Sequence, residues 1–141
     1  MPEIKPLSPD LFEDFFAILA ESNEEPLTEM EKAQLRIDFG AVRYTGWLLY
    51  SKGALAGMAI VIPSYSVAHV RPVLVLDELF VRPPFRGKGL GKMLFEHATD
   101  EARKGNYMRL EWRTRKENAV AQALYAQYQA DTNWIWYGMN L

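Results

Sequence analysis

The stretch that most constrains the fold is a strand, a glycine-rich turn, a helix and a second strand in succession. Residues 71–81, RPVLVLDELFV, form a nearly continuous apolar run, typical of a central strand buried on both faces. Two prolines end this strand, and three glycines alternate over 87–91 before a helix predicted over 91–104. Residues 107–114, YMRLEWRT, predict the next strand. One strand before a helix and one strand after it imply a parallel pair with a right-handed crossover.

Two helices are predicted near the N-terminus. Ser8 followed by Pro9 is a typical helix start, a capping hydroxyl and then proline at the first helical position, and apolar residues follow at helical spacing. Thr28 with Glu31 three residues later is a capping box, which opens a second helix to about Phe39.

The remaining pattern completes a mixed sheet. Residues 46–50 and 54–63 predict two strands around a tight turn, 119–128 predict a helix, and 133–141, NWIWYGMNL, predict a final strand. The order is therefore α-α-β-β-β-α-β-α-β. We expect an α/β (α+β) fold with a mixed, twisted central sheet, helices on both faces, and a single domain over 1–141.

Composition excludes several classes of function. The chain has no cysteine, which excludes disulfides, thiolate metal sites and a covalent cysteine intermediate. His69 and His97 are the only histidines and lie far apart in sequence, so we expect no metal site and no Ser-His-Asp triad. No apolar run is long enough for a membrane span, and the N-terminus lacks the pattern of a signal peptide, so we expect a cytoplasmic protein without a membrane partner.

Charge is unevenly distributed along the chain. Residues 1–40 carry ten acids and three bases, whereas residues 71–116 carry eleven bases and six acids. A basic segment around the glycine turn suits an anionic ligand. The acidic residues of 1–40 suit either a solvated helix surface or the attraction of a cationic substrate. The net charge of −2 gives no indication of a nucleic-acid partner.

The spacing of the glycines separates the candidate anions. A glycine turn at a helix start presents backbone N–H groups and the positive end of the helix dipole, which together suit a phosphate. A P-loop fails because Arg86 stands at its first glycine position and Met93 follows Lys92. A dinucleotide fingerprint fails because, from either possible start, no glycine occupies the place of its third glycine. The pattern that fits is R-x-x-G-x-G.

This pattern, Arg86, Gly89 and Gly91, resembles the pyrophosphate-binding motif of the GCN5-related N-acetyltransferase (GNAT) superfamily, which binds acetyl-coenzyme A. A second motif, N-x-x-A-x-x-L-Y, is similar to residues 118–125. Within this superfamily, the chain looks most similar to the diamine (spermidine/spermine-type) acetyltransferases. This finer resemblance rests on RLEW at 109–112, Asn118, Tyr125 and the late tryptophan before the expected final strand. One departure is Gln129, which stands where many members have glycine.

The resemblance implies direct acetyl transfer from acetyl-CoA to an amine, without a metal. Tyr125 is then the candidate acid that protonates the departing thiolate, because a phenol keeps its proton near pH 7; the structural alternative is a core tyrosine. Asp77 and Glu78 are candidates because both are acids within an apolar strand. Asp77 aligns with an acid of the diamine-type members and is the preferred base or water-positioning group, and Glu78 is the alternate. The structural alternative for these acids is an ion pair with an arginine such as Arg109.

The resemblance also implies a cofactor site. Leu79 and Val81 would pair with the pantetheine arm as an added strand does, and Asn118 would bind the pantetheine or cap the helix that follows it. The implied cofactor-binding set is Leu79, Phe80, Val81, Arg86, Gly87, Lys88, Gly89, Leu90, Gly91, Lys92, Asn118 and Tyr125.

The expected function is N-acetylation of a primary amine on a small molecule: a polyamine, a diamine or a lysine-like amino acid. The acidic segment 21–31, with Tyr65 in the segment 64–71, would shape the acceptor pocket. A homodimer follows from the resemblance alone. Two alternatives remain open, a non-catalytic CoA-binding or regulatory domain and an acetyltransferase for protein N-termini or lysines.

Overall fold

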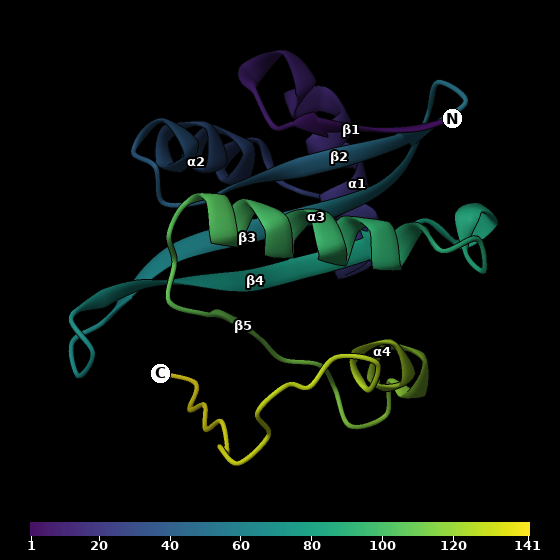
Figure 1. The fold of residues 1–141 in the computed structure, drawn as a ribbon. Helices are drawn as coiled ribbons and strands as arrows, with labels where there is room; N and C mark the ends of the chain where they lie inside the picture. Colours follow the sequence, from purple (N-terminus) through teal and green to yellow (C-terminus); the bar gives the residue numbers. More distant parts are fainter.

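The computed structural model describes residues 1–141 and contains one five-stranded sheet (Figure 1). Its strands are adjacent in chain order, each antiparallel to the one before except for the last, which runs parallel to its neighbour. They are β1 (Pro2–Pro6), β2 (Thr45–Ser51), β3 (Ala54–Ser66), β4 (Arg71–Val81) and β5 (Leu110–Trp112).

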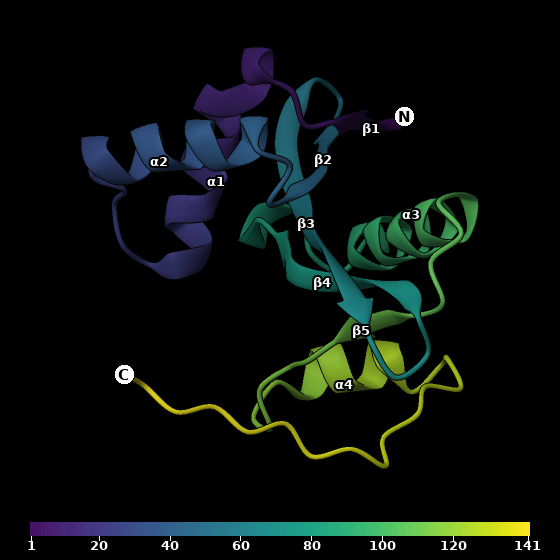
Figure 2. The same ribbon diagram turned by 90° about the vertical axis from the view of Figure 1, so that its left-hand side faces the viewer.

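Helices cover both faces of this sheet, as Figure 2 shows. Helices α1 (Phe12–Asn23) and α2 (Glu29–Gly40) lie on one face, and α3 (Leu90–Lys104) and α4 (Ala119–Tyr125) on the other. Two 3₁₀ turns, η1 (Pro9–Leu11) and η2 (Pro83–Phe85), precede α1 and α3. The predicted mixed α/β fold is confirmed. None of the helices is both long and apolar enough to cross a bilayer.

The sheet separates two hydrophobic clusters. One is rich in aromatic rings from α1, which pack on alternate residues of β2 and β3 and on Phe39 of α2. The other places Leu90, Leu94 and Phe95 of α3 against β2, β3 and the first half of β4. Both clusters contain side chains with no exposed surface, and burying each such side chain contributes about 1.5–3 kcal/mol. The sheet is therefore a rigid support for the loops at its ends.

The chain differs from the predicted element order at both ends. Residues 2–6 form an unpredicted strand, β1, whose two prolines are tolerated because it is the edge of the sheet. Ser8 makes no side-chain cap; its carbonyl accepts from the Leu11 N–H (2.9 Å) within η1 instead.

The predicted final strand over 133–141 is wrong, because these residues have no strand beside them and the sheet ends at β5. Alternating aromatic residues favour a strand only where a partner edge supplies hydrogen bonds. The last predicted helix is also shorter than 119–128, since α4 ends at Tyr125 and continues as i→i+3 turns to Tyr128.

Candidate functional site

The candidate site begins where β4 and β5 separate. These two strands pair only from Leu74 opposite Leu110 to Leu76 opposite Trp112. Residues 78–81 of β4 pair with residues 57–60 of β3 on one side, and residues 77–81 have no strand on the other. The backbone edge of this half of β4 is therefore open to a ligand that can bind as a strand does.

A β-bulge at Asp77 sets the orientation of the side chains in this open half. Val61 pairs with Leu76 and Ile60 with Glu78, so Asp77 has no partner on β3. The extra residue reverses the alternation. Leu79 and Val81 consequently pack with Leu76 on the α3 side, and Phe80 packs on the α1 side. Asp77 is exposed.

Glu78 points toward α1. The Ser22 Oγ of α1 donates to Glu78 Oε2 at 3.5 Å, although the two residues lie 56 positions apart. Burial raises the pKa of Glu78, and the Asp77 charge raises it further, while the Ser22 hydrogen bond and the Arg113 charge oppose this. A half-buried carboxyl with a raised pKa suits proton transfer. The ion-pair alternative does not hold for Arg109, whose carboxylate neighbour is Glu111 (3.8 Å).

Tyr125 lies where the pairing of β4 and β5 ends. Its ring packs on Phe95 of α3 and on Trp112, the final residue of β5, each at 5.3 Å between centroids. Burial raises the pKa of its phenol, so the hydroxyl keeps its proton at neutral pH. The structure therefore puts Tyr125 on the α3 side of the strand separation and Glu78 on the α1 side.

The loop between η2 and α3 forms a cradle of unused donors. Gly87 and Gly89 adopt left-handed conformations (φ 78° and 77°), which non-glycine residues rarely adopt. No hydrogen bond from the backbone N–H groups of residues 87–92 to a protein acceptor is found, and the first such bond in α3 comes from Met93 to the Gly89 carbonyl (3.1 Å). Free N–H groups at the start of a 15-residue helix suit an anion.

The cations around this loop are anchored to different degrees. Arg86 Nε donates to the Val81 carbonyl at 2.8 Å, and its guanidinium lies over the Phe80 ring, so Arg86 ties the loop to the end of β4. Lys92 Nζ donates to Gln127 Oε1 at 3.3 Å, and Lys88 lies over Phe85. The lysines are exposed. Positive charge therefore surrounds the free N–H groups.

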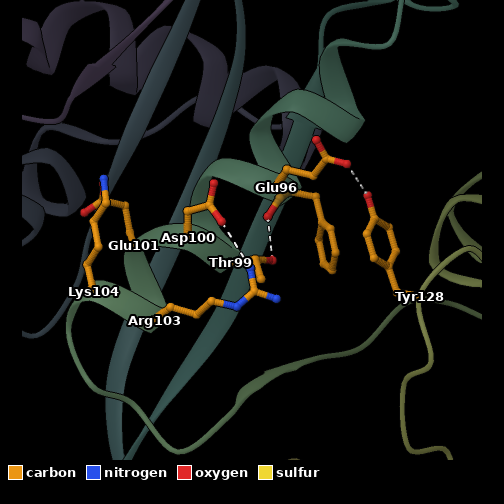
Figure 3. A network of polar contacts seen from close by, with 8 residues as sticks. Glu96, Thr99, Asp100, Glu101, Arg103, Lys104 and Tyr128 are labelled. Atoms are coloured by element: carbon orange, nitrogen blue, oxygen red, sulfur yellow. Dashed lines mark hydrogen bonds and ion pairs between the residues drawn. The ribbon is translucent and has the colours of Figure 1, made fainter.

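Asn118 is the N-cap of α4. Its Oδ1 accepts from the Ala121 N–H at 3.0 Å, which is the capping alternative for this residue. Beyond α4, the Tyr128 hydroxyl donates to Glu96 Oε1 at 2.9 Å, as Figure 3 shows. This bond and the tilted packing of the Tyr128 ring on Phe95 tie the turn after α4 to α3.

Two cavities lie near the site without including the β4 acids or Tyr125. One, of about 400 Å³, lies between α1 and α2, and its acids Glu25, Glu31 and Asp38 make it electronegative. The other, of about 370 Å³, lies along α3 beside Gly89. His97 packs edge-on against Trp47, and His69 contacts Ser66 in the β3–β4 hairpin. No group of three metal-ligating side chains is present.

Ser22 and Arg113 are the two residues around Glu78 that the sequence did not indicate. Ser22 stands in an ordinary helix end, and Arg113 directly follows β5 in a basic stretch. Neither position has a local pattern that marks it. Their relation to Glu78 exists only once α1 and β5 pack on β4, so only the fold could have identified them.

Comparisons with known proteins find similarity to acetyltransferases. The profile of the Acetyltransferase (GNAT) family matches residues 9–129. An uncharacterized N-acetyltransferase of Bacillus subtilis (strain 168) is 32% identical over 91 residues, 63% of this chain and 61% of that protein. The chain thus spans about three fifths of that relative. A thialysine N-epsilon-acetyltransferase of Caenorhabditis elegans is 30% identical over 132 residues, 87% of this chain and 79% of that protein.

Solved structures show the same fold. A ribosomal-protein-alanine N-acetyltransferase from Brucella melitensis biovar Abortus 2308 has a TM-score of 0.83 at 19% identity and covers all of both chains. An aminoglycoside N-acetyltransferase in complex with CoA has a TM-score of 0.82 at 17% identity and covers 100% of this chain and 96% of its own.

Proposed function

The chain belongs to the Acetyltransferase (GNAT) family, and from this premise we propose that it transfers an acetyl group from acetyl-CoA directly to a primary amine of a small molecule. The observation that carries the proposal is the separation of β4 from β5, with a half-buried carboxyl on one side and a protonated phenol on the other. Candidate acceptors are a polyamine, a diamine or a lysine-like amino acid.

The loop residues fit the phosphate end of this cofactor. The N–H groups of residues 87–92 are free, and nothing lies within 4 Å of where a Cβ would stand on Gly87 or Gly89, so a pyrophosphate can approach the backbone. Lys88 and Lys92 would add charge at the rim. Leu79 and Val81, on the open edge of β4, would hold the pantetheine arm; because Arg86 occupies the Val81 carbonyl, Leu79 is the freer of the two. Acetyl-CoA would supply the thioester that is broken and leave as a thiol.

The proposed chemistry divides between two side chains. Glu78 would accept the proton of the acceptor amine, directly or through a water, because it faces the α1 side, where the acidic cavity lies. Asp77, exposed at the bulge, would raise the basicity of Glu78 and remains the alternative base. Tyr125 would donate its proton to the departing sulfur. The raised pKa of the Tyr125 phenol keeps it protonated, as an acid must be, and the raised pKa of Glu78 makes its carboxylate, once deprotonated, a stronger base than an ordinary one.

The electronegative cavity between α1 and α2 supports a cationic acceptor. Glu25, Glu31 and Asp38 line it together with Asn23 of α1, and the neighbour of Asn23 in the chain, Ser22, donates to Glu78. A field of one sign attracts a ligand of the other. The similarity to an enzyme named for thialysine, a small amine, points in the same direction.

The experiment that tests the proposal is release of free thiol from acetyl-CoA against a panel of acceptors. The panel contains a polyamine, a diamine, lysine, thialysine, and peptides with an N-terminal alanine or an internal lysine. We expect turnover with at least one small amine and less with either peptide. Faster turnover of a peptide would replace the acceptor class with proteins.

Binding is measured separately from turnover. Acetyl-CoA at about 100 times its Kd should stabilise the fold by roughly 2.7 kcal/mol. No rise in Tm would refute the cofactor site. A rise in Tm without turnover on any acceptor would leave a CoA-binding regulatory domain.

A further inference from the structure

Arg82, the residue that directly follows β4, joins the end of that strand to β3 and to α1. Its backbone N–H donates to the Ala56 carbonyl (2.8 Å) and its Nη1 to the Leu55 carbonyl (3.2 Å), both at the start of β3. Its Nε donates to Glu21 Oε2 on α1 at 2.9 Å, and its Nη2 donates to the same oxygen. The guanidinium is 26% exposed. Because backbone carbonyls already fix this guanidinium, its ion pair is firmer than a typical surface pair.

The contact between Arg82 and Glu21 is the one ion pair of the chain that joins a helix to the sheet. The other ion pairs lie within a helix, between α1 and α2, within the segment after α2, or within β5 and the residue before it. Glu21 is followed by Ser22, whose hydroxyl donates to Glu78. The last turn of α1 therefore makes two polar contacts with the open half of β4 and its end, through adjacent residues.

Apolar packing does not hold the last turn of α1 in place. The buried side chains of this helix end at Ile18, and Leu19 is half-buried against the same cluster. The next apolar side chain along the chain that packs on this cluster is Leu27. Residues 20–23 therefore depend on the contacts of Glu21 and Ser22 for their position against the sheet.

The hydrogen bond from Ser22 to Glu78 is sensitive to this position. Its length of 3.5 Å is at the upper limit for a hydrogen bond. A small movement of α1 away from β4 is enough to remove it. The firm ion pair at Glu21 thus holds the weak hydrogen bond at the next residue within reach.

We propose that Arg82 is a positioning residue, which holds the last turn of α1 against β4 through Glu21 and so keeps the Ser22 hydroxyl on Glu78. This role rests on the proposed function, in which Glu78 accepts the proton of the acceptor amine. The charges that act on Glu78 are those of Asp77 on β4 and Arg113 after β5, and its partner on β3, Ile60, is uncharged. Arg82 therefore acts through the position of α1 and not through its own charge.

Loss of the Arg82 side chain should have two consequences for Glu78. The Ser22 donor, which favours the charged form of the carboxyl, moves out of reach, so the pKa of Glu78 rises further. The carboxylate is also less firmly placed, and misplacement of a reacting group by about 1 Å can cost roughly 10²-fold in rate.

Titration of the labelled Glu78 carboxyl by NMR tests the position without acceptor or cofactor, and Glu78→Gln identifies its signal. The pKa of Glu78 should be higher in Arg82→Gln and in Ser22→Ala than in the unaltered chain. The double variant Ser22→Ala/Arg82→Gln should match Ser22→Ala alone, because Arg82 acts through Ser22. An unchanged pKa in Arg82→Gln, or a shift that adds to that of Ser22→Ala, would overturn the proposal and leave the proposed function intact.

Two further variants make this titration decisive. Glu21→Ala breaks the same contact from the exposed side of α1 and keeps the bonds of Arg82 to β3, so it should fold even if Arg82→Gln does not, and it should also raise the pKa of Glu78. The matched control is Arg103→Gln, which loses an ion pair with Asp100 (3.1 Å) on α3 and should leave the pKa of Glu78 unchanged. Circular dichroism confirms that each variant is folded.

Steady-state kinetics connect the position to the reaction. In Arg82→Gln, kcat should fall roughly 10- to 100-fold, the KM for acetyl-CoA should change little, and the rise of kcat/KM with pH should move to higher pH. A merely structural role would lower Tm and leave the pH profile where it is, which would overturn the proposal. If the pKa of Glu78 moves and the kinetic profile does not, Glu78 is not the base, and the role of Arg82 in the reaction fails together with that assignment.

Discussion

The two halves of β4 have the same neighbour on one side and different surroundings on the other. Residues 71–76 lie between β3 and either β5 or the segment leading into it, whereas residues 77–81 have only β3. Leu76 is 4% exposed and belongs to the core, while Leu79, three residues later, is half-buried. A single strand therefore contributes to the core with one half and to the candidate site with the other.

The difference shows how a site can be made in a sheet at little cost to its stability. Strand β5 ends at Trp112, which leaves the backbone edge of β4 without a partner strand beyond that level. The bulge at Asp77 turns Glu78 away from the apolar α3 side. Strand β3 pairs with β4 on both sides of this bulge. We therefore expect substitutions around the paired half to affect stability and those around the open half to affect activity.

The largest expected effect on activity is that of Tyr125→Phe. Loss of a positioned acid typically lowers kcat by about 10²–10⁴-fold. The KM for acetyl-CoA and the Tm should change little, because the ring packing on Phe95 and Trp112 is retained. Steady-state kinetics and a thermal melt measure both. The matched control is Tyr128→Phe, which loses the bond to Glu96 outside the strand separation and should keep kcat. An unchanged kcat in Tyr125→Phe would remove its role as the acid.

The half of β4 that lies within the sheet, residues 71–76, is tested by Leu76→Ala. This substitution should lower the free energy of unfolding by about 2–5 kcal/mol. Leu79→Ala should cost about 1–2 kcal/mol, because its side chain is only half-buried. Denaturant unfolding measures both, and acetyl-CoA affinity should be unchanged in folded Leu76→Ala. Equal losses of stability would contradict the contrast between the two halves.

The loop that follows the open half is tested by Gly89→Val. A branched residue at φ 77° introduces strain of about 1–3 kcal/mol. Distortion that removes one charge-assisted bond to the pyrophosphate, about 1.5–3 kcal/mol, should raise the Kd of acetyl-CoA roughly 10- to 150-fold.

Gly53→Val is the matched control for this variant. Gly53 has φ 78° and nothing within 4 Å of its missing Cβ, like Gly89, but it lies in the β2–β3 turn. Both variants should lose similar stability, and only Gly89→Val should lose affinity in a calorimetric titration. Equal affinities in the two variants would show that the loop does not hold the cofactor.

The parts of the fold that depend on local chemistry were predicted from the sequence. The capping box of Thr28 and Glu31 forms as expected, with both hydrogen bonds at 3.1 Å. The turn at Lys52-Gly53 and the glycine turn before α3 also form where residue types alone require them. These features depend on neighbours within a few positions, so the sequence pattern is sufficient.

The parts that depend on distant partners could not be predicted. Strand β1 exists because β2 offers it an edge, and the segment 133–141 is unpaired although its composition favours a strand. The sequence identified Asp77 and Glu78 as candidate bases, but their orientations depend on a bulge defined by pairing with β3. The contact between Ser22 and Glu78 joins two elements that nothing local connects.

The smallest expected effects concern the pH dependence of the open half. Glu78 must be deprotonated to accept a proton, so kcat/KM should rise with pH through its pKa, at a higher pH than for an ordinary carboxyl. Asp77→Asn removes a like charge and should move this rise to lower pH. Ser22→Ala removes a donor that favours the charged form and should move it to higher pH. Profiles with one acceptor amine compare the variants directly. If both variants shift the rise in the same direction, or if it persists in Glu78→Gln, another group is the base.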